Sequence, residues 1–253
     1  MEFIEIYKKI QETYNTKIAQ DKGVARFYAK LRDGTATYAD ALTFAKKTGE
    51  ALYDACNAEM LAFFPDGGIP PEAIADLMPP ALKAQCREVL DNAAQVQKGI
   101  NRKAGVGLNP VNVEVSEDRV TGLVTHLQEY GITEEAKGLI VNLAQSQVDK
   151  TAYKNADFQT KSGMRVTVSR FYDDVGVNHR TETCKWCMDR TGVDIPYKIA
   201  YNRGMFERHP GCGCTIEYKT EKTAYIGRGS KSWWNWEEDP SILEKRKTYG
   251  LTD

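Results

Sequence analysis

The chain has 253 residues and a formal net charge of -1, with 42% hydrophobic and 27% charged residues. This length suffices for a helical domain plus a smaller module, and the composition excludes wholesale disorder. A near-zero net charge provides no long-range attraction to nucleic acid or to an anionic membrane. Because no apolar run resembles a signal peptide or reaches membrane-spanning length, we expect synthesis in a reducing cytoplasm and no membrane contact.

The first part of the chain, residues 1–104, is predicted to be a helical domain. Apolar residues recur there at spacings of three and four, which is the signature of amphipathic helices. Thr37 followed by Asp40 is typical of a helix start, and Pro70 or Pro71 can open the helix after a loop at 65–71. The two clearest apolar stripes consist of Phe3, Tyr7, Ile10, Tyr14 and Ile18, and of Leu82, Cys86, Val89, Ala93 and Val96.

Residues 105–160 are predicted to form a linker loop and further helices, with Ser116 and Thr133 as helix N-caps. After Gly163 the pattern changes from a helical period to alternation, first at Val166 and Val168 and again at 215–218. We therefore expect a mainly α protein, in which the helical domain is followed by a small α+β zinc-binding module at 161–235 and a tail at 236–253.

Residues suited to metal binding gather in that module. Cys184 and Cys187 are separated by two residues, so both thiolates can reach one ion where the backbone turns tightly. After 21 intervening residues comes His209, followed by Cys212 and Cys214. A zinc ion takes four such ligands in a tetrahedron. The second ligand pair is either His209 with Cys212 or Cys212 with Cys214, so five candidates compete for four positions.

Two other interpretations of these cysteines stay open. Cys184 and Cys187 could form a redox pair, although such pairs belong to a thioredoxin-like setting that this helical sequence does not predict. Alternatively, the thiols could be unused. Clustered cysteines in a reducing compartment favour metal binding, and Gly211 suits the tight turn that a second ligand pair needs. Cys56 and Cys86 lie on apolar helix stripes and are expected in the core.

A closed set of four ligands favours a structural zinc ion, because a catalytic ion keeps one position open for water. The enzymatic alternative is a zinc-stabilised nuclease of the HNH kind with His179 as the base. No histidine lies between Cys187 and His209, so the usual order of such nucleases is missing. We therefore expect no catalytic residues and no small-molecule substrate.

A third alternative is a DNA-binding or host-directed protein. Residues 161–231 contain 13 Lys or Arg and 8 Asp or Glu, a mild basic surplus that a solvated surface explains equally well. Downstream lies a cluster of Trp233, Trp234 and Trp236. These rings could stack on bases, pack on a partner protein or cover the module itself.

The motif residues resemble a known family. Cys184-Lys-Trp-Cys187, Gly192, Tyr197 and the run from Phe206 through His209-Pro-Gly-Cys212-Gly-Cys214 to Tyr218 are similar to the C-terminal module of bacteriophage minor head proteins of the Mu F-like head morphogenesis group. That group typically shows a CxxC pair and an HPxCRC-type ending. Gly213 departs from the pattern, because the family usually has arginine there.

The resemblance implies a minor capsid component made in the host cytoplasm and located in or on the virion head. Its expected partners are the portal protein, the major capsid protein or both, with packaged DNA as a further possibility. The implied role is structural, in head morphogenesis or in DNA packaging and delivery, with structural zinc as the cofactor.

Overall fold

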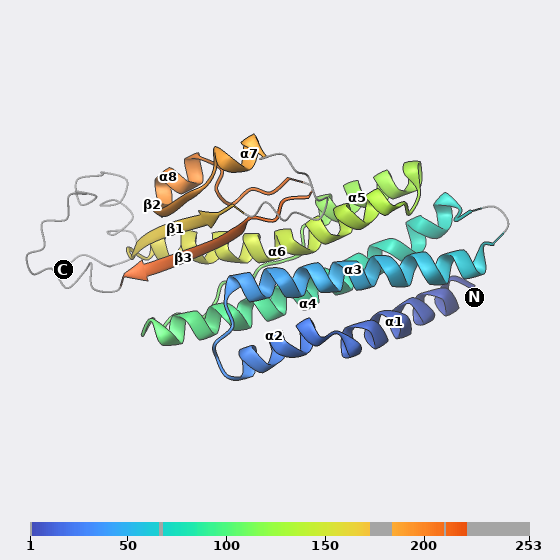
Figure 1. Ribbon diagram of the computed structural model, residues 1–253, viewed down its shortest axis with the longest axis horizontal. Coiled ribbons are helices and arrows are strands. Elements are labelled where there is room, and N and C mark those ends of the chain that lie inside the picture. Colours follow the sequence, from blue (N-terminus) through green and yellow to red (C-terminus); the bar gives the residue numbers. More distant parts are fainter. Residues whose placement is uncertain (1, 66–67, 173–183, 210, 222–253) are drawn as a thin grey trace, which may run out of the picture.

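The computed structural model describes residues 2–65, 68–172, 184–209 and 211–221, and its architecture is mainly helical with a three-stranded antiparallel sheet near the C-terminus (Figure 1). This confirms the predicted fold class. His179 and the cluster of Trp233, Trp234 and Trp236 lie outside the described residues. None of the described helices combines the length and the apolarity needed to cross a membrane.

The long helices run along the long axis of the molecule and account for most of its length (Figure 1). Their bounds are α1 Glu2–Gln20, α2 Lys22–Arg32, α3 Tyr38–Phe63, α4 Pro71–Lys103, α5 Glu117–Tyr130 and α6 Glu134–Lys161.

The helix starts follow the local signals in the sequence. Thr37 and Asp40 form a reciprocal capping box at the start of α3, and Pro71 occupies the first position of α4. Ser116 and Thr133 precede α5 and α6 as predicted, but neither side chain caps its helix. Ser116 Oγ instead accepts a hydrogen bond from Lys150 Nζ at 2.8 Å. Both N-cap positions were therefore predicted correctly. At Ser116, a hydrogen bond with α6 takes the place of the capping hydrogen bond.

The sheet has the order β2-β1-β3, with β1 spanning Arg165–Phe171, β2 Gly192–Pro196 and β3 Thr215–Glu221. The alternation predicted around Val168 and at 215–218 is confirmed by β1 and β3, where Val168 pairs with Tyr218. Strand β2 and the short helices α7 (Lys185–Met188) and α8 (Tyr197–Asn202) had no clear signal in the sequence. These short elements depend on the packing around them rather than on their own propensity.

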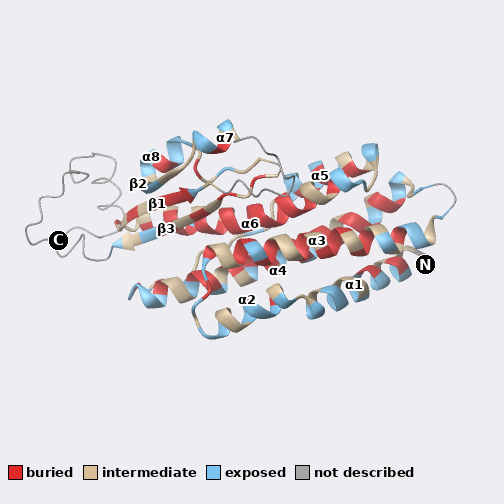
Figure 2. Ribbon diagram, in the orientation of Figure 1, coloured by how far each residue is buried: buried red, intermediate tan, exposed pale blue. Residues whose placement is uncertain are grey.

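The sheet and the helices share a core. Val166, Val168, Ile216 and Tyr218 belong to the same buried cluster as side chains of α2, α3, α4 and α6. Helix α6 lies between the sheet and the other helices and is buried along most of its length (Figure 2). The helices before residue 161 and the strands after it, which were predicted as separate parts, therefore contribute side chains to one buried cluster.

Helix α6 is unusual because much of what it buries is polar. Asn142, Gln145 and Asp149 are at most 7% exposed, and their spacing of three and four residues places them on one face. Buried polar side chains require hydrogen-bond partners. This face meets the segment that contains the candidate metal ligands.

The crossing of α3 and α6 depends on Gly49. A Cβ atom at this position would lie 2.8 Å from the Cα of Val141, closer than side chains tolerate. We expect Gly49→Ala to lower the free energy of unfolding by about 1–3 kcal/mol, the usual cost of overpacking. Chemical denaturation measures this change.

The matched control is Gly138→Ala on α6, where an added Cβ meets no atom within 4 Å. This variant should leave stability unchanged or raise it by up to about 1 kcal/mol, because alanine favours helix. Equal effects of the two substitutions would contradict the close approach of α3 and α6.

Candidate metal centre

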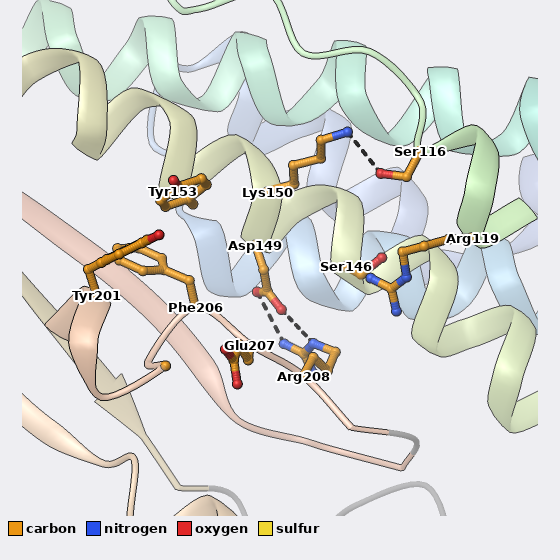
Figure 3. A pocket seen from close by; sticks show the side chains of 11 residues that line it. Ser116, Arg119, Ser146, Asp149, Lys150, Tyr153, Tyr201, Phe206, Glu207 and Arg208 are labelled. Carbon is orange, nitrogen blue, oxygen red and sulfur yellow. Dashed lines mark hydrogen bonds and ion pairs between the residues drawn. The ribbon is translucent and has the colours of Figure 1, made fainter.

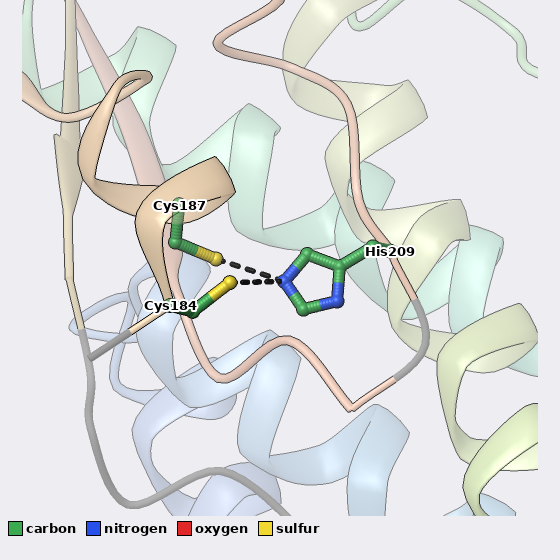
Figure 4. Close-up of side chains that lie close together, drawn as sticks. All are labelled: Cys184, Cys187 and His209. Atoms are coloured by element: carbon green, nitrogen blue, oxygen red, sulfur yellow. Dashed lines mark hydrogen bonds between the residues drawn. The ribbon is translucent and has the colours of Figure 1, made fainter. Parts of the chain in front are cut away.

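The first ligand pair is built on the short helix α7. Cys184 is its N-cap and Cys187 lies within it, and the Met188 backbone N–H donates to the Cys184 carbonyl at 3.0 Å. This single turn brings the two thiols to the same side, where both face His209 (Figure 4). The CxxC spacing therefore acts as predicted.

The second group lies in the segment that leads into β3. The Cys212 backbone N–H donates to the His209 carbonyl at 3.1 Å, which closes a tight turn. Gly211 has φ 74° in this turn, a conformation that glycine adopts without a steric penalty. Cys214 immediately precedes β3 and is fully buried.

The ligand atoms approach one another closely. His209 Nε2 lies 3.3 Å from Cys184 Sγ and 3.0 Å from Cys187 Sγ, and the Sγ atoms of Cys187 and Cys212 are 3.6 Å apart. Sulfur ligands about 2.3 Å from a tetrahedral ion would be about 3.8 Å apart, so the separation of Cys187 and Cys212 fits a shared ion. The two contacts of His209 are shorter than this, so the imidazole would move slightly outward to admit an ion.

The five residues form two overlapping groups rather than one. Cys184, Cys187 and His209 make the first, and Cys187, Cys212 and Cys214 make the second, with ligand atoms within 4.8 Å of one another in each. Cys187 belongs to both groups. The structure thus brings together all five predicted ligands in a cluster that could hold a metal ion.

A buried arginine lies beside the sulfur atoms. Arg170 on β1 is 1% exposed, and its guanidinium donates to Cys212 Sγ at 3.4 Å and to the Met205 carbonyl at 2.8 Å. Three or four thiolates around a divalent ion leave a net negative charge. The Arg170 cation offsets that charge where water is excluded.

Trp186, between the two cysteines of α7, covers another side of the cluster. Its ring meets the His209 ring edge-on at a centroid distance of 5.0 Å, and the Arg190 guanidinium lies 3.9 Å from its centre. These contacts fix the orientation of the imidazole. Orientation of ligands by surrounding residues commonly strengthens metal binding.

The segment from His209 to Cys214 is held on α6 by a buried ion pair. Arg208 and Asp149 have side chains only 2% and 3% exposed, with Nε to Oδ2 at 2.6 Å. The other side of the guanidinium donates to the backbone carbonyls of Cys212 and Cys214, to the latter at 2.8 Å. Although burial alone would lower the pKa of Arg208, the Asp149 charge raises it, so the cation is retained.

Asn142 makes a second connection between α6 and the ligand segment. Its side-chain amide donates to the His209 carbonyl at 2.7 Å, and its oxygen accepts from Arg119 at 3.2 Å. The polar face of α6 is therefore satisfied by the ligand segment itself. This explains how so many polar side chains are buried at low cost.

Without a metal ion, neighbouring thiols of the cluster differ in their pKa values. Burial raises the pKa of Cys187 to about 11. A hydrogen bond from Cys212 lowers the pKa of Cys214 to about 7, and the charge of Arg170 acts in the same direction. Metal binding must displace protons from the remaining thiols, so metal affinity falls as the pH falls.

The other cysteines behave as predicted from their apolar stripes. Cys56 and Cys86 are fully buried in the helical core, and burial raises the pKa of each thiol to about 12. His126 lies on α5, where its ring centroid is 4.7 Å from that of Tyr130, and it does not belong to the cluster. His179, the base of the nuclease alternative, is outside the described residues.

The residues that surround the ligands were not predicted from the sequence. Arg170 follows Val166 and Val168 at the alternating spacing of β1, so the pattern places it on the inward face, but nothing in the sequence indicated what its charge would contact there. No local pattern marked Asp149 as the partner of Arg208. Only Arg208 carried a usable signal, because it directly precedes the ligand His209.

Comparisons with protein-family models, curated proteins and solved structures find no match to this chain. The resemblance to phage minor head proteins therefore rests on the motif residues.

Removal of the Arg208–Asp149 ion pair should affect both stability and metal binding. Arg208→Met leaves the Asp149 carboxylate buried without a partner, and we expect the free energy of unfolding to fall by about 3–5 kcal/mol. The carbonyls of Cys212 and Cys214 also lose their donor, so metal affinity should fall about 10- to 100-fold. Denaturation and competition with a chelator measure the two effects.

Lys219→Met is the control, because the ion pair of Lys219 with Asp194 is exposed and contributes about 1 kcal/mol or less. An Arg208→Met protein as stable as this control would show that the buried pair does not hold the segment in place.

Proposed function

We propose that the cluster is a structural zinc site with Cys184, Cys187, His209 and Cys212 as ligands. His209 Nε2 contacts both Cys184 and Cys187, and Cys187 Sγ lies 3.6 Å from Cys212 Sγ, which supports this choice. Cys212 belongs to the second group of ligand atoms, so its side chain must move toward the first group to complete a tetrahedron. Thiolate and imidazole donors suit zinc, and four protein ligands leave no position for a reacting water. Cys214 is then a buried thiol that donates a hydrogen bond to the thiolate of Cys212.

The role of such an ion is to join three parts of the chain. It would bind α7 to the turn at His209 and to the segment entering β3, while Arg208 and Asn142 hold that segment on α6. The ion therefore stabilises a surface on one flank of a long helical body. A site of this kind supports an interaction protein better than an enzyme.

We infer from the motif that this chain is a bacteriophage minor head protein, located in the virion and acting in head morphogenesis or in DNA packaging and delivery. The observation that supports this most is the pairing of CxxC with HPxCxC around one compact cluster. The helical body would contact the portal protein, the major capsid protein or both. Packaged DNA is a further candidate partner.

The ligand assignment predicts the zinc content of single variants. We expect Cys187→Ser to reduce the content from about one ion per chain to background, because Cys187 belongs to both ligand groups. Cys214→Ser should keep its zinc. Elemental analysis of the purified chains measures both.

Cys86→Ala provides the control, since it removes a buried thiol that lies in the helical core. If Cys214→Ser loses zinc while His209→Ala retains it, the ligands are four cysteines instead. Full zinc content in Cys187→Ser would contradict the site altogether.

Metal removal should act locally. Binding of structural zinc contributes on the order of 10 kcal/mol in small zinc domains, and here it would be concentrated in α7 and residues 209–214. We expect a chelator to raise hydrogen exchange in those segments first and to leave α3 and α4 protected. Uniform exchange after metal loss would show that the helices depend on the ion as well.

The virion assignment is tested on particles. Mass spectrometry of purified particles from the phage or prophage that encodes this chain should detect it as a minor component. A chain present in infected cells but absent from complete particles would contradict the assignment.

A further inference from the structure

A cavity of about 440 Å³ lies beside the Arg208–Asp149 pair, between α5, α6 and the segment after α8 (Figure 3). Its volume is within the range of small-molecule sites. The site described above does not use this cavity.

Two cations line one side of the cavity. Lys150 Nζ donates to Ser116 Oγ at 2.8 Å and to the Glu114 carbonyl at 2.7 Å, and Arg119 donates to the amide oxygen of Asn142. Within the described residues, neither cation has a carboxylate within 4.0 Å. Their hydrogen-bond partners are neutral, and carboxylates act on them only at longer range, Asp149 on Arg119 and Glu114 on Lys150.

The carboxylates at the cavity are already engaged. Both oxygens of Asp149 accept from Arg208, at 2.6 and 3.2 Å. Glu207 is largely exposed, with its carboxylate 3.8 Å from Arg190 Nε. The acidic groups therefore compete little with an anion for Lys150 and Arg119.

Lys150 is half-buried and Arg119 remains exposed, so a bound anion could reach both cations. Partial desolvation lowers the pKa of the Lys150 ammonium, with the charge of Lys154 acting in the same direction, and desolvation lowers the pKa of the Arg119 guanidinium. A bound anion would favour the charged form of both groups.

The opposite side of the cavity is aromatic. Tyr153 and Tyr201 are nearly parallel at a centroid distance of 5.9 Å, and Phe206 lies 5.4 Å from Tyr153. The Tyr201 side chain is 54% exposed, which is unusual for a large ring. Figure 3 shows these rings across the cavity from Lys150 and Arg119.

We propose that this cavity binds a nucleotide, with the phosphate at Lys150 and Arg119 and the base against the rings of Tyr153 and Tyr201. Arginine and lysine are the common phosphate ligands, and aromatic rings stack on bases of any sequence. The phosphate could belong to a free nucleotide or to a nucleic-acid strand. The proposal goes beyond the minor head role and does not depend on it or on the zinc site.

Calorimetric titration of the whole chain with AMP, adenosine and inorganic phosphate tests the proposal. We expect AMP to bind at least about 10-fold more tightly than adenosine or phosphate, because each of these offers only one of the two contacts. Lys150→Met should weaken AMP about 10-fold or more, whereas Lys219→Met, which removes an exposed lysine of β3 outside the cavity lining, should change affinity only a few-fold.

Tyr201→Ser tests the aromatic side, and it should weaken AMP while leaving phosphate unchanged. A trinucleotide that binds more tightly than AMP, and is equally sensitive to Lys150→Met, assigns the phosphate to a strand. Tighter binding of AMP assigns it to a free nucleotide. Equal affinity for AMP and adenosine, or no AMP binding by a protein with an unchanged thermal transition, overturns the proposal.

Discussion

The ion pair between Arg208 and Asp149 is the contact on which the candidate site depends. It joins the middle of α6 to the residue that precedes His209, and it does so where both side chains are almost completely buried. The same guanidinium holds the carbonyls of Cys212 and Cys214. One cation therefore fixes the position of three of the five candidate ligands relative to the helical body.

Charge balance around the cluster follows a consistent pattern. Arg170 approaches the sulfur of Cys212 from β1, and Arg208 approaches the backbone of the same segment from α6. A divalent ion with three thiolates carries a net negative charge, and the buried Arg170 cation reduces the cost of burying it, whereas the charge of Arg208 is already balanced by Asp149. Arg208 provides the partner that lets Asp149 on α6 be buried. Arg170 on β1 is in turn satisfied by the Met205 carbonyl and the sulfur of Cys212.

Much of the fold was predictable because it follows local patterns. Helical stripes, the capping box at Thr37 and the alternation in β1 and β3 all arise from neighbours in the chain. The candidate ligands were predictable for the same reason, since CxxC is a local geometry. Strand β2, helix α8 and the surroundings of the ligands were not predictable. Their roles depend on contacts such as Asn142 with His209, which are 67 residues apart.

A buried ion pair is seldom the most stable way to join two elements, because desolvation offsets most of its electrostatic gain. A pair of apolar side chains in place of Arg208 and Asp149 could anchor the segment on α6 equally well. It could not donate to the carbonyls of Cys212 and Cys214, which would then be left without the donor that the guanidinium supplies. The ion pair is thus better explained by the orientation it gives the ligand segment than by the stability it adds. The same reasoning applies to Asn142, whose amide satisfies the His209 carbonyl at a point where an apolar side chain would leave it unpaired.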